Sequence, residues 1–252
     1  MTALGGRIVR FAALPVVLLA CWQLASGLGL LSPIFLPPPT RVLRALGALL
    51  ADGSLLDATL LTTGRALLGL GVATVAGGVV GILVATSPLI DDLTRPGREF
   101  LRALPTVTVV PALMVVLGVG SGLSISVVAL GAIWPILLAT VHGLRGIDPT
   151  LVDVGRVHRL GSLATTTRIR LPAALAEIVT GIRISLAIAL VIALVAEMVT
   201  GSGGLGALVI EARSRFRSAD VFAIVAVIGA VGFALNAVMI RLEALSRPAD
   251  LD

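Results

Sequence analysis

Six long apolar runs, separated by short polar segments, limit the folds open to this chain more than any other feature. They occupy residues 11–31, 61–86, 103–119, 123–144, 176–199 and 221–241. A helix of about 20 apolar residues spans the hydrocarbon core of a bilayer, because its own hydrogen bonds satisfy its peptide groups. The runs therefore predict an all-α, polytopic membrane protein with about six transmembrane helices, forming one domain over residues 1–252.

Composition supports this class and narrows the chemistry. Hydrophobic residues make up 57% of the chain and charged residues 13%, against about 25% charged residues in an ordinary soluble domain. All 19 basic residues are arginines, so the lysine of a standard P-loop is missing and any ATP hydrolysis is expected in another subunit. One cysteine and two histidines are too few for an internal disulfide or a histidine metal cluster. We expect no cofactor, no metal and no nucleic acid.

The first apolar run has two interpretations. Residues 11–31 follow Arg7 and Arg10, and the stretch ending at Cys21 loosely resembles a lipoprotein cleavage site, so a secretory signal is one of them. The favoured interpretation is an uncleaved first span, because the run continues past Cys21 to nearly spanning length. After it come three consecutive prolines at 37–39 and then Thr40, which is expected to N-cap an amphipathic helix at the outer interface.

Prolines and glycines mark three of the expected spans. Pro105 and Pro111 interrupt the short run at 103–119, which makes it a candidate pore wall, with simple kinking as the alternative. Trp134 and Pro135 are expected to break the run at 123–144. Glycines are dense in residues 61–86 and favour close helix contact there over a ligand-contacting role.

The distribution of arginines predicts the orientation. With the N-terminus inside, twelve arginines fall in segments assigned to the cytoplasm and six in segments assigned to the outside. Cytoplasmic loops of membrane proteins carry an excess of positive charge. We therefore expect a multi-pass plasma-membrane protein with both termini in the cytoplasm and a long cytoplasmic loop at 145–175.

That loop is the longest polar interruption in the chain. A short helix is expected from Thr150 to about His158, with Asp148 as its cap and Pro149 at its first position. Leu151, Val154 and Val157 are spaced three residues apart and so fall on one face. The pattern favours a docking platform connected to the membrane spans. The alternative is a solvated cationic loop held near anionic lipid.

An acidic residue and a cluster of glycines follow the fifth run. Glu197 lies near its outer end, and intramembrane carboxylates are candidates for function. Pairing with an arginine, as a structural contact or a gate, is favoured over direct contact with a solute. Gly203, Gly204 and Gly206 predict a re-entrant turn with close backbone approach.

The loop resembles the cytoplasmic EAA loop of permease subunits of bacterial ABC importers. The family pattern is EAA, three residues, Gly, nine residues and I-x-L-P. Ile169, Arg170, Leu171 and Pro172 match its end, which puts Asp153 at the glutamate position and Val154 and Gly155 at the two small positions. The family glycine falls on Arg159, and the nearest glycine is Gly161, so the central turn is expected two residues later than in the family.

Further stretches resemble the nitrate, sulfonate, taurine and bicarbonate branch of that family, at residues 36–40, 65–69, 96–111, 134–145, 196–198 and 203–206. The resemblance implies a type I importer fold with a cytoplasmic coupling helix. It also implies a second permease subunit, as a homodimer, two cytoplasmic ATP-binding-cassette ATPases and an external solute-binding protein. The implied function is a solute pathway without enzymatic activity of its own, for a small anion such as a sulfonate, taurine or nitrate.

Two other classes of function remain. A self-contained channel or secondary transporter would show inverted repeats and polar groups at mid-membrane, and no repeat is obvious in this sequence. A membrane-embedded enzyme is less favoured still, because no paired acids or Ser/His set stands out.

Overall fold

The computed structural model describes the backbone of residues 2–246 and the side chains of residues 13–243, and this part of the chain is helical without a β-strand. The longer helices are α1 (Thr2–Gly27), α2 (Pro39–Ala51), α3 (Ser54–Thr86), α4 (Pro88–Ala103), α6 (Ser121–Arg145), α10 (Leu175–Thr200), α11 (Gly204–Ser214) and α12 (Ser218–Ser246). The shorter elements are the 3-10 turn η1 (Thr106–Val109), α5 (Val110–Leu117), α7 (Pro149–Val157), α8 (Ser162–Thr165), the π-turn η2 (Thr166–Arg170) and α9 (Leu171–Ala173). The side chains of Arg7 and Arg10, and the whole of Arg247, bear on the orientation and lie outside the described residues.

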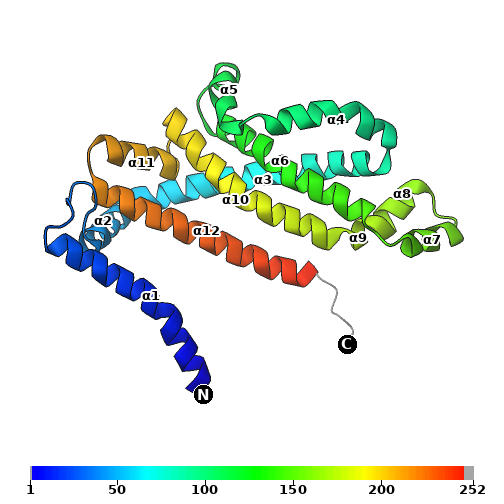
Figure 1. The fold of residues 1–252 in the computed structure, drawn as a ribbon. Helices are drawn as coiled ribbons and strands as arrows, with labels where there is room; N and C mark the ends of the chain where they lie inside the picture. The colour runs from blue at the N-terminus through cyan, green and yellow to red at the C-terminus, as the bar shows by residue number, and fades with distance from the viewer. Residues whose placement is uncertain (1, 247–252) are drawn as a thin grey trace.

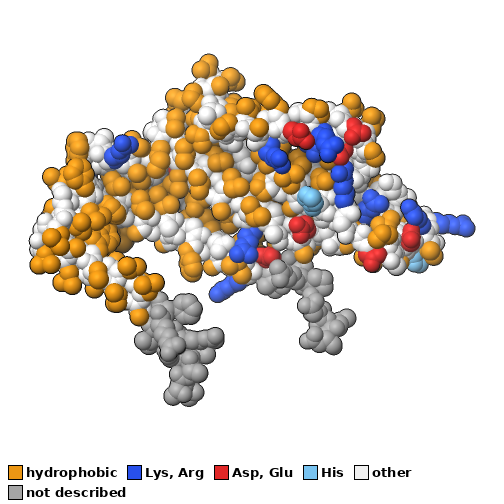
Figure 2. Space-filling view, viewed as in Figure 1, with side chains coloured by type: hydrophobic (Ala, Val, Ile, Leu, Met, Phe, Trp, Pro, Cys, Tyr) orange, Lys and Arg blue, Asp and Glu red, His pale blue; other side chains and the backbone are white. Residues whose placement is uncertain are grey.

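Four helices, α3, α6, α10 and α12, are long and apolar enough to cross a membrane. Figure 1 shows them side by side, with α2 and α11 at one end of the bundle and α7 and α8 at the other. Hydrophobic side chains cover most of the visible face in Figure 2, whereas charged ones gather over α4 and at the α7 end. An apolar outer surface of this kind suits a lipid environment. The predicted all-α polytopic membrane fold is confirmed.

Glycines on one face of α3 set how closely α3 packs on α6. A Cβ added at Gly69 would lie 2.4 Å from Val128 Cγ1, and one added at Gly81 would lie 2.7 Å from Thr140 Cβ. Neither distance is compatible with a real side chain, so the two backbones approach each other only because these residues are glycines. The helix contact predicted for the glycine-rich run is confirmed at these positions.

The region expected as a third span differs from one continuous rod. Helices α4 and α5 meet at a bend of 88°, with η1 between them, and count as a fifth span only if taken together. The eight residues of α5 reach about 12 Å, well short of a bilayer core of about 30 Å. Leu104 has ψ 125° because the proline that follows disfavours helical backbone before it.

Pro135 does not break α6, which runs as one helix from Ser121 to Arg145. The expected break at Trp134 and Pro135 is therefore wrong. Membrane helices tolerate prolines where neighbouring helices support the chain, and beside Pro135 helix α6 packs closely on Gly77 of α3 and Gly181 of α10.

The first two helices flank the bundle. The apolar part of α1 ends at Gly27, and Trp22 contacts Phe222 of α12 with ring centroids 5.7 Å apart. Helix α2 is N-capped by Pro38, with Pro39 as its first residue, so the expected cap at Thr40 is wrong. Proline is preorganised for the first helical position and has no N–H to leave unsatisfied there.

Candidate functional site

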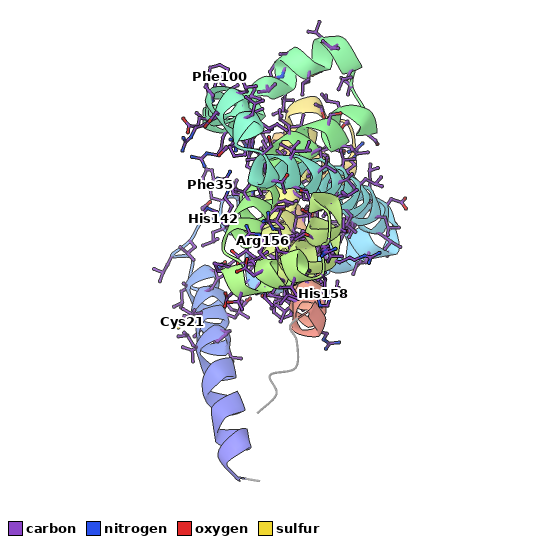
Figure 3. The ribbon with its side chains drawn as sticks, turned by 90° about the vertical axis from the view of Figure 1, so that its right-hand side faces the viewer. Cys21, Phe35, Phe100, His142, Arg156 and His158 are labelled. Atoms are coloured by element: carbon purple, nitrogen blue, oxygen red, sulfur yellow. The ribbon has the colours of Figure 1, made fainter. Side chains whose placement is uncertain are left out.

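The loop between α6 and α10 forms the projecting end of the molecule that faces the viewer in Figure 3, where Arg156 and His158 are labelled. Helix α7 begins as predicted. The Asp148 side chain accepts a hydrogen bond of 2.8 Å from the Thr150 N–H, and Pro149 is the first helical residue. The backbone N–H of Thr150 holds the pKa of Asp148 below its ordinary value, so the cap stays ionised at neutral pH.

The outer face of α7 carries apolar side chains that the described part of the chain leaves largely exposed. Leu151, Val154 and Val157 are 46%, 48% and 80% exposed. Beside them, Arg156 donates to Asp153 over 2.7 Å, and both side chains are exposed. We call Leu151, Val154 and Val157 the α7 ridge. An exposed apolar ridge on a polar projection is typical of a surface that contacts another protein.

Gly155 allows α7 to pack closely against the rest of the loop, because it has no side chain. It is buried, and a Cβ added there would lie 3.0 Å from Ile169 Cδ1 and 3.2 Å from Thr165 Oγ1. The small residue thus lets α7 rest on η2, which contains Ile169. Leu171 and Pro172 are the first residues of α9, which connects η2 to α10.

The turn after α7 corrects one expectation. Arg159 has φ +53° and occupies the left-handed position. The Leu160 N–H donates to the Gly155 carbonyl over 2.9 Å, and the Arg159 N–H donates to the Arg156 carbonyl over 2.9 Å. These two bonds define a Schellman cap. Gly161 has φ −66°, so the turn lies at Arg159, where the family has its glycine, and is not displaced by two residues.

At the opposite end of the bundle, Glu197 forms a buried ion pair that joins two long helices. Arg65 Nη1 of α3 donates to Glu197 Oε1 of α10 over 2.9 Å, with side-chain exposures of 4% and 0%. Thr62 Oγ1 donates to Glu197 Oε2 over 2.8 Å. The pairing with an arginine expected for Glu197 is confirmed, and its carboxylate oxygens are already occupied by protein donors.

The glycine cluster folds over this ion pair. Gly203 and Gly204 have φ +83° and +87°, and a Cβ at Gly204 would lie 2.2 Å from Glu197 Oε1. The Gly206 N–H donates to Glu197 Oε2 over 3.1 Å. The close backbone approach predicted for these glycines is confirmed. Sequence reasoning missed Arg65 and Thr62 as the partners, although Arg65 is the one charged residue in the apolar part of α3.

The remaining candidate residues lie elsewhere. Pro105 caps η1, Pro111 lies in the first turn of α5, and Trp134 lines a cleft between α4 and α6. Near that cleft, Arg145 of α6 donates to the Val84 carbonyl at the end of α3 over 2.9 Å. The structure therefore gathers Gly203, Gly204 and Gly206 around Glu197 and places Trp134 in a separate cleft.

Comparisons with known proteins find similarity along most of the chain. The family described as "Binding-protein-dependent transport system inner membrane component" matches residues 77–249. The putative aliphatic sulfonates transport permease protein SsuC of Bacillus subtilis is 33% identical over 219 residues, covering 87% of this chain and 79% of that protein. The bicarbonate transport system permease protein CmpB of Synechocystis is 33% identical over 241 residues, covering 91% of this chain and 85% of that protein.

A solved structure supports the fold. The chain is similar to one in a structure of the MetNI methionine ABC transporter in inward-facing conformations, with a TM-score of 0.69 and 17% sequence identity. The match covers 79% of this chain and 98% of that chain.

Proposed function

Because this chain belongs to the family of binding-protein-dependent transport system inner membrane components, we propose that it forms the solute pathway of an ABC importer and that α7 receives the force of ATP hydrolysis. The chain is a multi-pass membrane permease of the nitrate, sulfonate and taurine type, and the ATPase activity lies in a separate subunit. The observation that carries the coupling role is the exposed α7 ridge on a loop braced from beneath.

The α7 ridge docks into a groove of a cytoplasmic ATP-binding-cassette ATPase. Burying Leu151, Val154 and Val157 against the ATPase removes apolar surface from water and so favours association. Gly155 and the Schellman cap at Arg159 hold the helix in one orientation on η2. A helix held this way transmits displacement, because packed elements move as rigid bodies.

The Arg65–Glu197 pair holds together the end of the helix bundle opposite α7. Arg65 also donates to the Ser121 hydroxyl at the start of α6 over 3.1 Å and to the Ser202 carbonyl over 2.9 Å. The outer ends of α3, α6 and α10 are thus joined to the turn before α11. Force applied at the cytoplasmic ends of these helices then moves all three together and does not separate their outer ends.

The assembly contains two copies of this chain as a homodimer, two ATPases and an external solute-binding protein. Each copy is one permease domain with both termini and α7 in the cytoplasm, and the arginine distribution supports this orientation. The sulfonate and bicarbonate relatives support a small anion as the transported solute.

The test reconstitutes the permease with its ATPase subunit in proteoliposomes and measures uptake driven by solute-loaded binding protein. Uptake is expected to require both the ATPase and ATP. Asp153→Arg, or deletion of residues 150–160, is expected to abolish coupled uptake while leaving membrane insertion intact. Thr167→Arg, an exposed change on the same loop, is the matched control and is expected to transport normally.

Two results would contradict the proposal. Normal uptake by the deletion variant would remove the docking role of α7. Uptake by the permease alone, down an ion gradient and without ATPase, would instead favour a self-contained channel or secondary transporter.

A further inference from the structure

A cleft of about 260 Å³ lies between α4 and the inner half of α6, and its lining includes Arg102, Trp134 and His142. A second cleft of about 430 Å³, between α6 and α10, shares these three residues. Figure 3 shows His142 on the same side of the molecule as Phe100 of α4. The two clefts therefore adjoin along α6, with Arg102 lining both, and together they make up the α6 groove.

The α4 part of this groove is cationic. Four arginines line it, namely Arg95, Arg98, Arg102 and Arg145, against the two acids Asp91 and Glu99. Asp91 contacts both Arg98 and Arg145, and Glu99 lies 3.7 Å from Arg95. Both acids of this part of the groove are thus already engaged, and they leave an excess of two positive charges.

Arg102 is the arginine of this set that has no acidic partner among the described side chains. The helix dipole offers one explanation for an arginine here, because Arg102 lies in the last turn of α4, where a positive charge is favourable. That explanation accounts for the charge but not for its surroundings. Arg102 and His142 are exposed and Trp134 is half-buried, and the three side chains line the same cleft from facing helices.

The chemistry of the groove suits a small oxyanion. A guanidinium presents parallel N–H groups that match two oxygens of a sulfonate, nitrate or carboxylate group. Glu177, the acid that lines the α10 part of the groove, does not line the α4 part. An anion is therefore favoured at the α4 side of Arg102 and disfavoured farther along, towards Glu177.

We propose that this groove is an anion-binding station on the cytoplasmic half of the permease, with Arg102 as its anchoring and specificity-determining residue for a small oxyanion. The identification of that anion with the transported solute rests on the proposed function. The existence of the site rests on the groove alone, so the two are tested separately.

Trp134 can report on the groove by its fluorescence, because the chain has only one other tryptophan, Trp22. In full-length Trp22→Phe protein in neutral detergent, the fluorescence of Trp134 is quenched with iodide and with uncharged acrylamide at constant ionic strength. Iodide is expected to quench Trp134 more strongly than it quenches Trp22 in the Trp134→Phe protein, relative to acrylamide. In water, a single positive charge raises the concentration of a monovalent anion at a separation of roughly 6 Å about threefold. Arg102→Gln is therefore expected to lower iodide quenching about threefold and to leave acrylamide quenching unchanged.

Competition and a matched variant complete the test. Methanesulfonate, which does not quench, is expected to protect Trp134 from iodide in the Trp22→Phe background and to lose this effect with Arg102→Gln. Arg44→Gln, an exposed change on α2, is expected to alter neither result. Equal iodide quenching with and without Arg102, or equal protection by chloride and methanesulfonate, would overturn the proposal.

Transport separates this proposal from the proposed function. If the reconstituted importer takes up solute but Arg102→Gln changes neither iodide quenching nor the KM for uptake, the anion station is wrong and the importer stands. If methanesulfonate protects Trp134 but no ATP-driven uptake occurs, the site stands and the importer function fails.

Discussion

Arg65 of α3 and Glu197 of α10, 132 residues apart in the sequence, meet in an ion pair of 2.9 Å that is shielded from solvent. The pair is satisfied on all sides, since Thr62, the Gly206 N–H, the Ser121 hydroxyl and the Ser202 carbonyl supply further hydrogen bonds. Buried charges persist in a protein only when they are paired and hydrogen-bonded in this way. The surrounding residues are therefore as tightly constrained as the two charged ones.

Removing one partner of this pair is expected to destabilise the protein severely. Glu197→Leu leaves a buried guanidinium without its counter-charge, which costs about 3–5 kcal/mol. The double variant Arg65→Met/Glu197→Leu is expected to lose less than the sum of the two single changes, because no unpaired charge remains. Thermal unfolding of the purified permease in detergent measures this coupling. Strictly additive losses would show that the two residues do not depend on each other.

Gly204 tests the packing of the turn over the ion pair. Gly204→Ala places a methyl group 2.2 Å from Glu197 Oε1 in addition to straining a φ of +87°. Gly201→Ala provides a matched control, because φ is +62° there and no described atom lies within 4 Å of an added Cβ. Strain alone costs about 1–2 kcal/mol, so Gly201→Ala should lower the melting temperature modestly and Gly204→Ala much further. Equal effects in the two variants would argue against the close approach.

Gly155 tests the brace beneath α7. Gly155→Val is expected to push α7 away from Ile169 and to reduce ATPase-coupled uptake strongly, while Gly155→Ala should be mild because the neighbouring Cδ1 is the flexible end of a side chain. Gly161→Ala is the control, since its backbone is extended and no described atom lies within 4 Å of the new methyl group. Uptake and ATPase binding are measured on the same reconstituted samples. Normal ATPase-coupled uptake in Gly155→Val would mean that coupling does not depend on the packing of α7 against η2.

Replacing Arg159 by glycine is expected to stabilise the cap at the end of α7. It is a non-glycine residue at φ +53°, a conformation that costs an L-residue roughly 1 kcal/mol and that glycine adopts freely. Arg159→Gly should therefore strengthen the Schellman cap and slow hydrogen exchange of the Leu160 amide, whereas Arg159→Val should speed it. Arg159→Asn separates charge from conformation, because asparagine tolerates the left-handed region without the positive charge. Faster exchange in Arg159→Gly would contradict this account.

Several features were determined by the sequence alone. The apolar runs at 61–86, 123–144, 176–199 and 221–241 correspond to α3, α6, α10 and α12, because a long apolar run in a membrane has few alternatives to a helix. The cap at Asp148, followed by Pro149 at the first helical position, was equally readable, since a cap depends on side chains within a few residues of it. The family resemblance rested on motifs of the same local kind.

Other features were decided only by tertiary structure. The sequence does not show that Arg65 is the partner of Glu197, because the pairing depends on how two distant helices pack. It does not show that α6 passes through Pro135 unbroken while the chain bends at Leu104 and Pro105, because a proline breaks or is accommodated according to its neighbours. It also misplaced the turn after α7. The nearest glycine pointed to Gly161, but α7 ends with the Leu160 and Arg159 N–H groups bonded to the carbonyls of Gly155 and Arg156, and this cap places Arg159 in the left-handed conformation. Local chemistry thus specifies the helices and their caps, whereas contacts across the bundle specify which of them bend and which charges meet.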